Sequence, residues 1–507
     1  MKLLSAVVSI AAARRWKRFE AATADPVGAQ MKVFYRLIRR AANTQWGREV
    51  KLAEIRTVEQ FRRRIAVTRY EQAAPLWHKA FEGARDVTWP GHVRYFALSG
   101  GTTAGNKALP VTSDAIASNR RAGGLLAAIL ARRGGAAALL AGKFMYLGGP
   151  TTLTERGPCL CGDASGIMSR RIPFFVRPRH LPEPDVAAVT DWEEKVSLVV
   201  QRYLTANVGL LGTLPSWAVL LFRQMRQAAE QRGLPQRDVS ELWPRLAHFV
   251  SYGMAFEPYR NAFQEYVKRD IHYTDTYSSS EGGMTAIQVE AGGPMRLIVD
   301  NGVFFEFVPA DQADQADPPR LHIGEVSTGV DYAVMLSTNG GIWAYPLGDL
   351  VRFESLRPPR IVFAGRTQVQ LSAFGEHVPG GLIEKAVAAA CKATAAIVAD
   401  YTVWPRFPSS DQPTPAHRWI VEFDRPPDDS ERFVTMLDET IRVENEDYNV
   451  HRMNDYGLEG PVLMPVAAGT FYEYMKREGR LGGQNKVPRV VRSDEMGRDL
   501  VAISETM

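Results

Sequence analysis

The chain has 507 residues, of which 45% are hydrophobic and 10% aromatic, and its formal net charge at pH 7 is +5. This length predicts roughly two to four domains, and so small a charge without a lysine tract disfavours nucleic-acid binding and suits an anionic small molecule. Three cysteines argue against a disulfide framework and favour a reducing compartment, and no stretch reaches the about 18 uninterrupted apolar residues of a membrane span.

The N-terminal segment is apolar at first and then strongly basic. Met1 to Ala13 superficially resembles a short signal peptide, but the run Arg14-Arg15-Trp16-Lys17-Arg18 follows at once. Helix-like periodicity continues through Phe34 and Ile38. We therefore predict an amphipathic N-terminal helix rather than an export signal and, with the low cysteine content, a cytoplasmic location.

A glycine- and hydroxyl-rich loop, Ser99 to Lys107, lies between the strand-like runs Val93–Leu98 and Ala108–Val111. Consecutive glycines let backbone N–H groups turn inward, and hydroxyls and a lysine add donors for phosphate oxygens. An ordinary hairpin tip has a similar composition, so the loop alone leaves both interpretations open. The candidate phosphate-binding residues are Ser99, Gly101, Thr102, Thr103 and Lys107.

This loop does not fit the Walker pattern. Gly100 and Gly105 have the Walker separation, but Asn106 stands where that motif needs lysine. A strand-like run also follows the loop, and the next helix is predicted to begin only near Thr112 to Asp114, whose side chains can cap free N–H groups.

Helical and strand-like patterns are mixed along the chain, which indicates an α/β or α+β architecture. Helical patterns cover 113–133, 191–206, 215–232 and 255–268, and strand-like runs cover 295–299, 303–308, 333–337 and 361–363. A domain boundary is predicted just after Gly365, because the chain beyond it offers two helices and a strand, enough for a second domain of about 140 residues.

Two motifs in the middle of the chain carry oxygen ligands. In Tyr277-Ser278-Ser279-Ser280-Glu281, the tyrosine ring could stack on a purine, Ser280 could bind phosphate, and Glu281 could hold Mg²⁺. In Tyr345-Pro346-Leu347-Gly348-Asp349, a tight glycine turn could present the Asp349 carboxylate to ribose hydroxyls. A serine-rich turn and a capping aspartate are the alternative interpretations.

The last motifs lie around and beyond the predicted boundary. Gly365-Arg366-Thr367-Gln368 precedes Gly375-Glu376-His377, and Lys486 lies in a glycine-bounded run near the C-terminus. A lysine on such a loop is a mobile charge that can reach an anionic site, although most exposed lysines have no such role.

With these motifs in this order, the chain resembles the adenylate-forming enzymes, and within them the auxin-responsive acyl acid amido synthetases (the Gretchen Hagen family) and their bacterial relatives. The likeness extends from about residue 30 to the end, and its narrower part lies in Tyr332–Asp349 and in the run from Asp447 to Arg489. It implies an α/β fold with a large N-terminal adenylation domain of mixed sheets and packed helices (1–365). A smaller, mobile α+β C-terminal domain (366–507) would follow.

The resemblance also implies the chemistry. ATP and Mg²⁺ would activate a carboxylic acid as an acyl-adenylate, and an amine, expected to be an amino acid, would then form an amide. The implied contacts are Ser99 to Lys107 with the β- and γ-phosphates, Tyr277 with adenine, Ser280 with the α-phosphate, Asp349 with ribose, Arg366 with the nucleotide at the hinge, Glu281 with Mg²⁺, and Lys486 with the reacting carboxylate or α-phosphate. Glu281 and Lys486 are the candidate catalytic residues.

Two departures from the plant pattern leave other functions open. Gly100 stands where a second serine is usual, and His377, a candidate nucleotide contact, stands where the plant motif has lysine. A ligase that forms a thioester with coenzyme A or a carrier protein, and a catalytically degenerate nucleotide-binding regulator, are the alternatives. The acid pocket would lie among the helices between 113 and 265, where Trp217, Phe222, Tyr252 and Phe256 could pack a ring or belong to the core.

Overall fold

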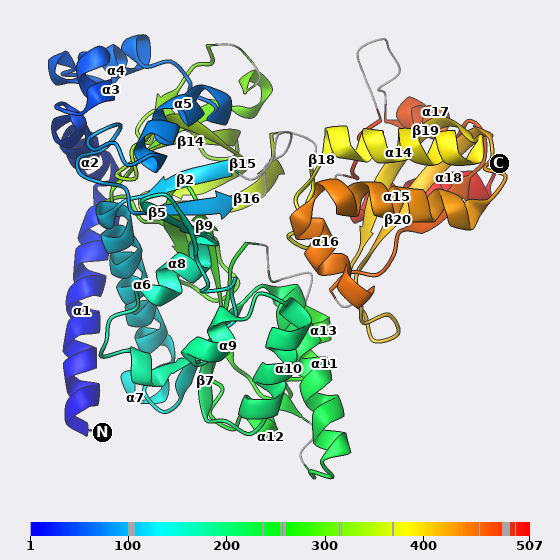
Figure 1. The fold of residues 1–507 in the computed structure, drawn as a ribbon, viewed down its shortest axis with the longest axis horizontal. Coiled ribbons are helices and arrows are strands. Elements are labelled where there is room, and N and C mark those ends of the chain that lie inside the picture. The colour runs from blue at the N-terminus through cyan, green and yellow to red at the C-terminus, as the bar shows by residue number, and fades with distance from the viewer. Residues whose placement is uncertain are drawn as a thin grey trace.

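The computed structural model describes residues 2–99, 107–235, 238–253, 256, 260–313, 315, 317–367, 370–455, 457–478, 487–491 and 493–507. It has a large N-terminal part built on a twelve-stranded sheet and a separate, smaller C-terminal domain (Figure 1). The predicted fold class is thereby confirmed. None of the helices within these ranges is long and apolar enough to cross a membrane.

One half of the large sheet is parallel. Its strands, in spatial order, are β6 (His180–Leu181), β3 (Lys143–Tyr146), β7 (Val208–Thr213), β8 (His248–Ser251) and β9 (His272–Ser279). Every neighbouring pair among these five is parallel. Because their carboxyl ends share one edge, the residues that follow β3, β7, β8 and β9 are brought together there, as in other open α/β sheets with ligand sites.

The other half of the sheet is antiparallel. From β9 it continues through β10 (Gly283–Gln288), β11 (Met295–Leu297), β16 (Pro359–Arg366), β15 (Ile342–Leu356), β14 (Asp331–Thr338), β12 (Val303–Pro309) and β13 (Leu321–His322). Three of the four predicted strand runs fall within these strands, and the fourth, 295–299, is a strand only as far as Leu297, where β11 ends. The Tyr345–Asp349 motif lies inside β15 and not in the predicted tight turn, although Gly348 does have a positive φ of 84°.

A second sheet has the order β2 (Lys107–Val111), β1 (Tyr95–Ser99), β5 (Cys159–Gly162) and β4 (Thr154–Arg156). β1 and β2 pair antiparallel with Ser99 opposite Lys107, which confirms that the predicted loop joins two strands. Thr112 caps the helix after β2 by accepting a hydrogen bond from the Ala115 N–H at 3.0 Å, as predicted.

The helices of the N-terminal part cover both sheets (Figure 1). They are α1 (Lys2–Ala24), α2 (Pro26–Ala41), α3 (Gln45–Glu49), α4 (Val58–Arg64), α5 (Tyr70–Phe81), α6 (Ser113–Gly134), α7 (Ala136–Leu139), α8 (Ala164–Arg170), α9 (Pro184–Ala188), α10 (Trp192–Tyr203), α11 (Pro215–Gln231), α12 (Val239–Leu242) and α13 (Arg260–Gln264), with short 3-10 turns at Leu52–Glu54, Arg177–Arg179 and Ala310–Gln312. The helix predicted over 255–268 is α13 alone in the described part of that range.

The N-terminal helix prediction needs correction. Asp25-Pro26 ends α1 and starts α2, because proline fits the first turn of a helix and the Asp25 carboxylate accepts from the Gly28 N–H at 3.0 Å. The amphipathic pattern belongs to α2, where Val33, Phe34, Leu37 and Ile38 are buried. α1 instead runs beside α6 and leaves most of its described side chains at least partly exposed (Figure 1).

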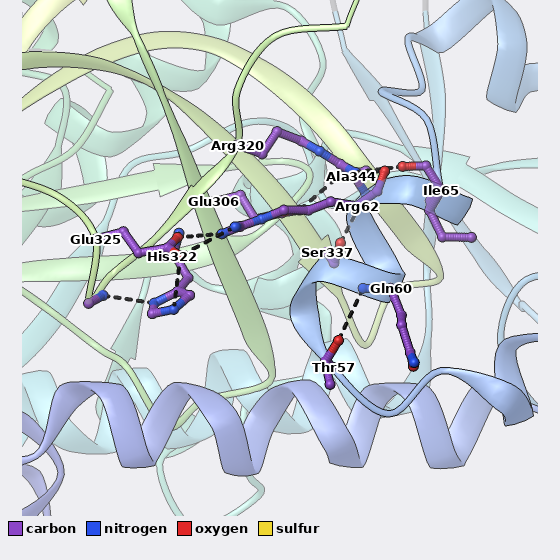
Figure 2. Close-up of polar contacts among 11 residues, drawn as sticks. Thr57, Gln60, Arg62, Ile65, Glu306, Arg320, His322, Glu325, Ser337 and Ala344 are labelled. Atoms are coloured by element: carbon purple, nitrogen blue, oxygen red, sulfur yellow. Dashed lines mark hydrogen bonds and ion pairs between the residues drawn. The ribbon is translucent and has the colours of Figure 1, made fainter.

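Charged side chains hold α4 against the antiparallel half of the sheet (Figure 2). Glu306 is fully buried on β12, with Arg62 Nε and Arg320 Nη1 each 3.6 Å from its carboxylate oxygens. Arg62 also binds Glu325 at 2.6 Å, and Arg320 Nη2 donates to the carbonyls of Arg62 and Ile65 at 2.7 Å. Burial raises the pKa of Glu306 and the two guanidinium groups oppose that shift.

The C-terminal domain has its own layers. A three-stranded sheet, β19 (Ile397–Arg406), β20 (Ala416–Arg425) and β21 (Val462–Val466), accompanies the helices α14 (Gly380–Thr394), α15 (Ser430–Glu444), α16 (Glu446–Arg452), α17 (Thr470–Arg477) and α18 (Asp494–Glu505), a 3-10 turn at Met453–Asp455, and the short pair β17 (Gln370–Leu371) and β18 (Val378–Pro379). It contacts the N-terminal part through α16, where the His451 ring lies 5.0 Å from that of Trp217 on α11. Arg223 on α11 also donates to the Thr414 hydroxyl at 2.9 Å.

Candidate functional site

Lys107 closes the hairpin of the predicted phosphate loop at the start of β2. Its ammonium lies 5.5 Å from the centre of the Tyr70 ring, and the Tyr70 hydroxyl accepts from the Ala108 N–H at 2.9 Å. Gly101, Thr102 and Thr103 lie outside the described residues, as does the side chain of Ser99. The described structure therefore fixes both ends of the loop on neighbouring strands.

Tyr277 and Asp349 come together from β9 and β15. The Tyr277 hydroxyl donates to Asp349 Oδ2 at 2.7 Å, and both side chains are only 8% exposed. The opposite partner of Asp349 on β16 is Arg366, whose side chain lies outside the description. A buried carboxylate held by a phenol is pre-positioned to accept further hydroxyl donors. The Tyr277 ring packs among core residues such as Leu297 and Leu336.

Ser280 and Glu281 occupy the turn between β9 and β10, at the carboxyl end of the parallel half of the sheet. Gly283 follows with φ +67°, and a Cβ there would lie 2.4 Å from Asn119 Oδ1 on α6, so glycine is required. Ser280 and Glu281 are both half-buried. The turn thus presents a hydroxyl and a carboxylate at the edge where ligands bind in this class of sheet.

Tyr345 lies within electrostatic reach of Glu281 and of Glu71 and Tyr70 at the start of α5. Its pKa is raised by burial first and then by the negative charges of Glu281 and Glu71, with Tyr70 adding to the shift. The residue before it, Ala344, has φ +42°, and its N–H donates to Ser337 Oγ at 2.9 Å (Figure 2). The β14–β15 register shifts at this point, and such irregularities often redirect side chains beside functional sites.

On the C-terminal side, His377 precedes β18 with φ +47°. Its Nδ1 lies 3.6 Å from Asp447 Oδ2, and its carbonyl accepts from Asn445 Nδ2 at 3.0 Å. Burial raises the pKa of Asp447 to about 6, and the charges of Glu446, Asp163 and Glu376 act in the same direction. Asp163, on the N-terminal part, is thus near enough to Asp447 for its charge to affect the pKa of that group. Lys486 lies outside the described residues.

The structure adds a polar group that the sequence did not indicate. It consists of Tyr146 at the end of β3, Asp163 and Ser165 after β5, Lys195 on α10 and Tyr252 after β8. Of these, Tyr252 alone was a candidate from the sequence. Asp163 Oδ1 accepts from the Ser165 and Gly166 N–H groups at 2.7 and 3.1 Å, which caps α8. The two tyrosines are hydrogen-bonded to each other, and Tyr252 also donates to the Leu147 carbonyl at 2.9 Å.

Lys195 is the unusual member of this group, because an ammonium is rarely buried. It is 2% exposed, and its Nζ donates to the Gly148 carbonyl at 3.4 Å. Burial lowers its pKa to about 8, against the opposing effect of Asp163. No spacing signal marks Lys195 in the sequence. The Gly148-Gly149 pair after β3 is the one available hint, since a Cβ at Gly149 would lie 2.3 Å from Asp163 Cγ.

The predicted acid-pocket residues have different surroundings. Phe222 and Phe256 are fully packed against the rings of Phe263 and Tyr273 and belong to the core. Trp217 packs against Trp192 and against His451 of the C-terminal domain. Of the four, Tyr252 alone belongs to the polar group at the strand ends.

Three models of one family match the chain in order. The GH3 family N-terminal domain matches residues 15–232, the central domain matches 296–366, and the C-terminal domain matches 382–495. Together they cover most of the chain, including β15 and β16 with Asp349, although β9 and the Tyr277–Glu281 motif lie between matched ranges.

Similar proteins come from plants. A jasmonoyl-L-amino acid synthetase, JAR4, of Nicotiana attenuata is 26% identical over 201 residues, which is 36% of this chain and 34% of that protein. A probable indole-3-acetic acid-amido synthetase, GH3.12, of Oryza sativa subsp. japonica is 24% identical over 452 residues, 70% of this chain and 71% of that protein. The chain thus spans about a third of the first relative and about seven tenths of the second.

A solved structure shares the fold. The AtGH3.15 acyl acid amido synthetase in complex with 2,4-DB superposes with a TM-score of 0.59 at 18% identity, covering 96% of this chain and 95% of that chain. The overlap includes both the large sheet and the C-terminal domain.

Proposed function

Because the chain belongs to the GH3 family, we propose that it is an ATP-dependent acyl acid amido synthetase. It activates a carboxylic acid as an acyl-adenylate and transfers the acyl group to an amine, for which an amino acid is the expected acceptor. The observation that carries this proposal is the buried hydrogen bond between Tyr277 and Asp349, which joins two of the motifs that define the predicted nucleotide site.

The reaction has two steps. A carboxylate oxygen of the acid attacks the α-phosphorus of ATP, and pyrophosphate leaves. The amine nitrogen then attacks the acyl carbon, AMP leaves, and the nitrogen loses a proton to a base. The first step replaces a poor leaving group with a phosphate ester, so the protein's task is alignment and neutralisation of charge.

We assign these tasks to residues by their position in the predicted motifs. Asp349 accepts from the ribose hydroxyls while Tyr277 fixes its orientation beside adenine. Ser280 donates to the α-phosphate, and Lys107 with the loop from Ser99 neutralises the β- and γ-phosphates. Arg366 contacts the nucleotide at the start of the C-terminal domain, and His377 takes the place of the plant lysine.

Glu281 fits a magnesium site in which the nucleotide phosphates supply some of the ligands. Mg²⁺ is commonly bound through one or two carboxylates together with phosphates and water. Within the described residues no cluster of three His, Cys, Asp or Glu side chains forms a closed protein site, and one half-buried carboxylate at the strand ends suits the open kind. Bound there, Mg²⁺ would neutralise phosphate charge.

We place the acyl group and the acceptor at the carboxyl ends of β3, β7 and β8, beside Tyr146, Asp163 and Lys195. The domains are proposed to divide at 365/366, and the C-terminal domain to move between the two steps. That movement would bring Lys486 to the α-phosphate during adenylation and withdraw it afterwards.

A product assay tests the proposal. The protein is incubated with ATP, Mg²⁺ and a panel of carboxylic acids, each with amino acids, with hydroxylamine and with coenzyme A, and products are identified by mass. An acid-dependent amide with an amino acid is the expected product. A thioester alone would establish the thioester-forming ligase instead, and the absence of acid-dependent pyrophosphate throughout would favour the nucleotide-binding regulator.

A further inference from the structure

The turn between α8 and the Arg177–Arg179 3-10 turn exposes two neighbouring phenylalanines. Phe174 is 81% and Phe175 70% exposed, the highest values for any aromatic side chain in the described residues. Their rings meet edge to face at 5.7 Å. Single exposed apolar residues are ordinary, but an adjacent aromatic pair with almost no protein cover indicates contact with something outside the molecule.

The turn is held in shape by its own backbone. The Val176 N–H donates to the Pro173 carbonyl at 2.9 Å, and the Arg179 N–H donates to the Val176 carbonyl at 2.9 Å. The Arg177 guanidinium also donates to the Ile172 carbonyl at 3.2 Å. The two rings are therefore presented by an ordered turn, which lowers the entropy cost of inserting them elsewhere.

Four arginines lie within four positions of this pair in the sequence. They are Arg170, Arg171, Arg177 and Arg179, and residues 164–182 contain no Asp or Glu. Within the described part of the chain none of the four forms an ion pair. Arg170, Arg177 and Arg179 donate to carbonyls, and Arg171 lies over the Tyr95 ring. His180 adds no positive charge, because burial lowers its pKa to about 4.

We propose that the Phe174–Phe175 turn docks the protein on an anionic membrane surface. Aromatic rings favour the headgroup level of a bilayer, and neighbouring arginines are attracted to anionic lipids. Because the described residues contain no membrane-crossing helix, the contact is peripheral and reversible. A protein partner with an acidic, apolar face is the competing occupant. The membrane is favoured because two exposed rings, with arginines on either side of them in the sequence, can enter a bilayer surface without a matching pocket.

The position of the turn links this surface to the rest of the molecule. It follows α8, whose N-terminal cap is Asp163, and Asp163 belongs to the polar group at the strand ends. Apolar carboxylic acids concentrate in bilayers, so docking would bring the protein close to such acids. The docking itself does not depend on the proposed reaction and can be measured without it.

Vesicle flotation of the full-length protein tests the proposal. Vesicles of phosphatidylcholine alone are compared with vesicles containing about a third phosphatidylglycerol. We expect binding to the anionic vesicles, weakened by added salt and unaffected by millimolar glycerol phosphate. The double variant Phe174→Ser/Phe175→Ser should lose at least about tenfold in binding, and Arg177→Gln about fivefold, the factor for one arginine near an anionic surface. Tyr472→Ser, which changes an aromatic residue that is 63% exposed on α17, is the matched control and should bind like the wild type.

Equal binding to both kinds of vesicle, no binding to either, or unchanged binding of the double phenylalanine variant would overturn the proposal. Loss of binding with glycerol phosphate would reassign the arginines to a soluble anion. A dimer in sedimentation that the double variant dissociates would reassign the turn to self-association. The melting temperatures of all variants should match the wild type, since the altered side chains are exposed.

Discussion

The two sides of the candidate site are built in different ways. On the N-terminal side, Tyr277, Asp349 and Arg366 lie on strands of one sheet, and the Tyr277–Asp349 bond is buried and 2.7 Å long. On the C-terminal side, His377 and Asp447 lie 3.6 Å apart and are both more than a third exposed. The proposed nucleotide side is therefore already formed by strand pairing, whereas the geometry of the other side depends on the position of the C-terminal domain.

The largest expected effect comes from the C-terminal side. Lys486→Ala should slow adenylation by about 10²–10³-fold, as for the loss of one donor from an anionic transition state. ATP–pyrophosphate exchange measures this step, and ATP affinity should change much less. Lys476→Ala, an exposed lysine on α17, is the control. Unchanged exchange in Lys486→Ala would remove this lysine from the mechanism.

The next largest effect is expected at Lys195, the buried lysine of the polar group at the strand ends. Burial lowers the pKa of Lys195 from 10.5 to about 8, so between these pH values the unfolded chain binds a proton that the folded chain does not. The wild type therefore loses stability as pH falls from 10.5 to 8, by about 3 kcal/mol.

Lys195→Met removes this dependence, so its free energy of unfolding relative to the wild type should be higher at pH 7.5 than at pH 10.5. Denaturant unfolding at both pH values measures the difference. Lys385→Met, which changes an exposed lysine paired with Glu444, should show no such trend. A flat difference for Lys195→Met would mean that the folded protein does not perturb this lysine.

Asp349→Ala tests the preformed side. It should weaken ATP binding by about 1–3 kcal/mol, because it removes the acceptor proposed for the ribose hydroxyls and the hydrogen bond that orients Tyr277. Calorimetric titration with ATP measures the loss. Asp331→Ala, on the neighbouring strand and paired with Arg352 at the surface, is the matched control. An unaltered dissociation constant for Asp349→Ala would refute the ribose assignment.

The smallest effect is expected at Asp447. Because burial raises its pKa from 3.8 to about 6, the unfolded chain loses this proton first as pH rises. The group therefore favours the folded state below pH 4, and that advantage disappears as pH passes 6. Asp447→Asn should be more stable than the wild type at pH 7 and similar at pH 3.5.

Solvent screening at this half-exposed side chain limits the gain to less than about 1 kcal/mol. Thermal unfolding across this range measures it, with the exposed Asp424→Asn as control. A gain that is the same at both pH values would contradict the raised pKa.

Prediction from sequence succeeded for features that depend on short stretches of the chain. The strands around the phosphate loop, the Thr112 cap and the strand runs all depend on short patterns of apolar residues and capping side chains. The prediction of the N-terminal helix was wrong about its extent. The apolar periodicity continues past Asp25-Pro26, although this pair ends one helix and begins the next. The predicted turn at Gly348 is a distorted part of β15, which the register with β14 reveals and the glycine alone could not.

The roles of Lys195 and Asp163 could not be predicted, because the contacts between their surroundings arise only from tertiary packing. They are separated by 32 positions and meet only when α10 lies over the end of β3, beside the cap of α8. The Tyr277–Asp349 bond spans 72 positions. The order of the two motifs along the chain revealed the residues, but their contact depends on the sheet, in which β10, β11 and β16 lie between β9 and β15. Sequence order thus indicated the residues, and the sheet determined which of them touch.

The central claim is that this site activates a carboxylic acid with ATP. Isotope exchange between pyrophosphate and ATP, measured with and without a panel of carboxylic acids and before any amine is added, tests it most directly. The account predicts exchange that requires both an acid and Mg²⁺ and that falls strongly in Asp349→Ala. Exchange that is absent for every acid, or that proceeds equally without one, would contradict it.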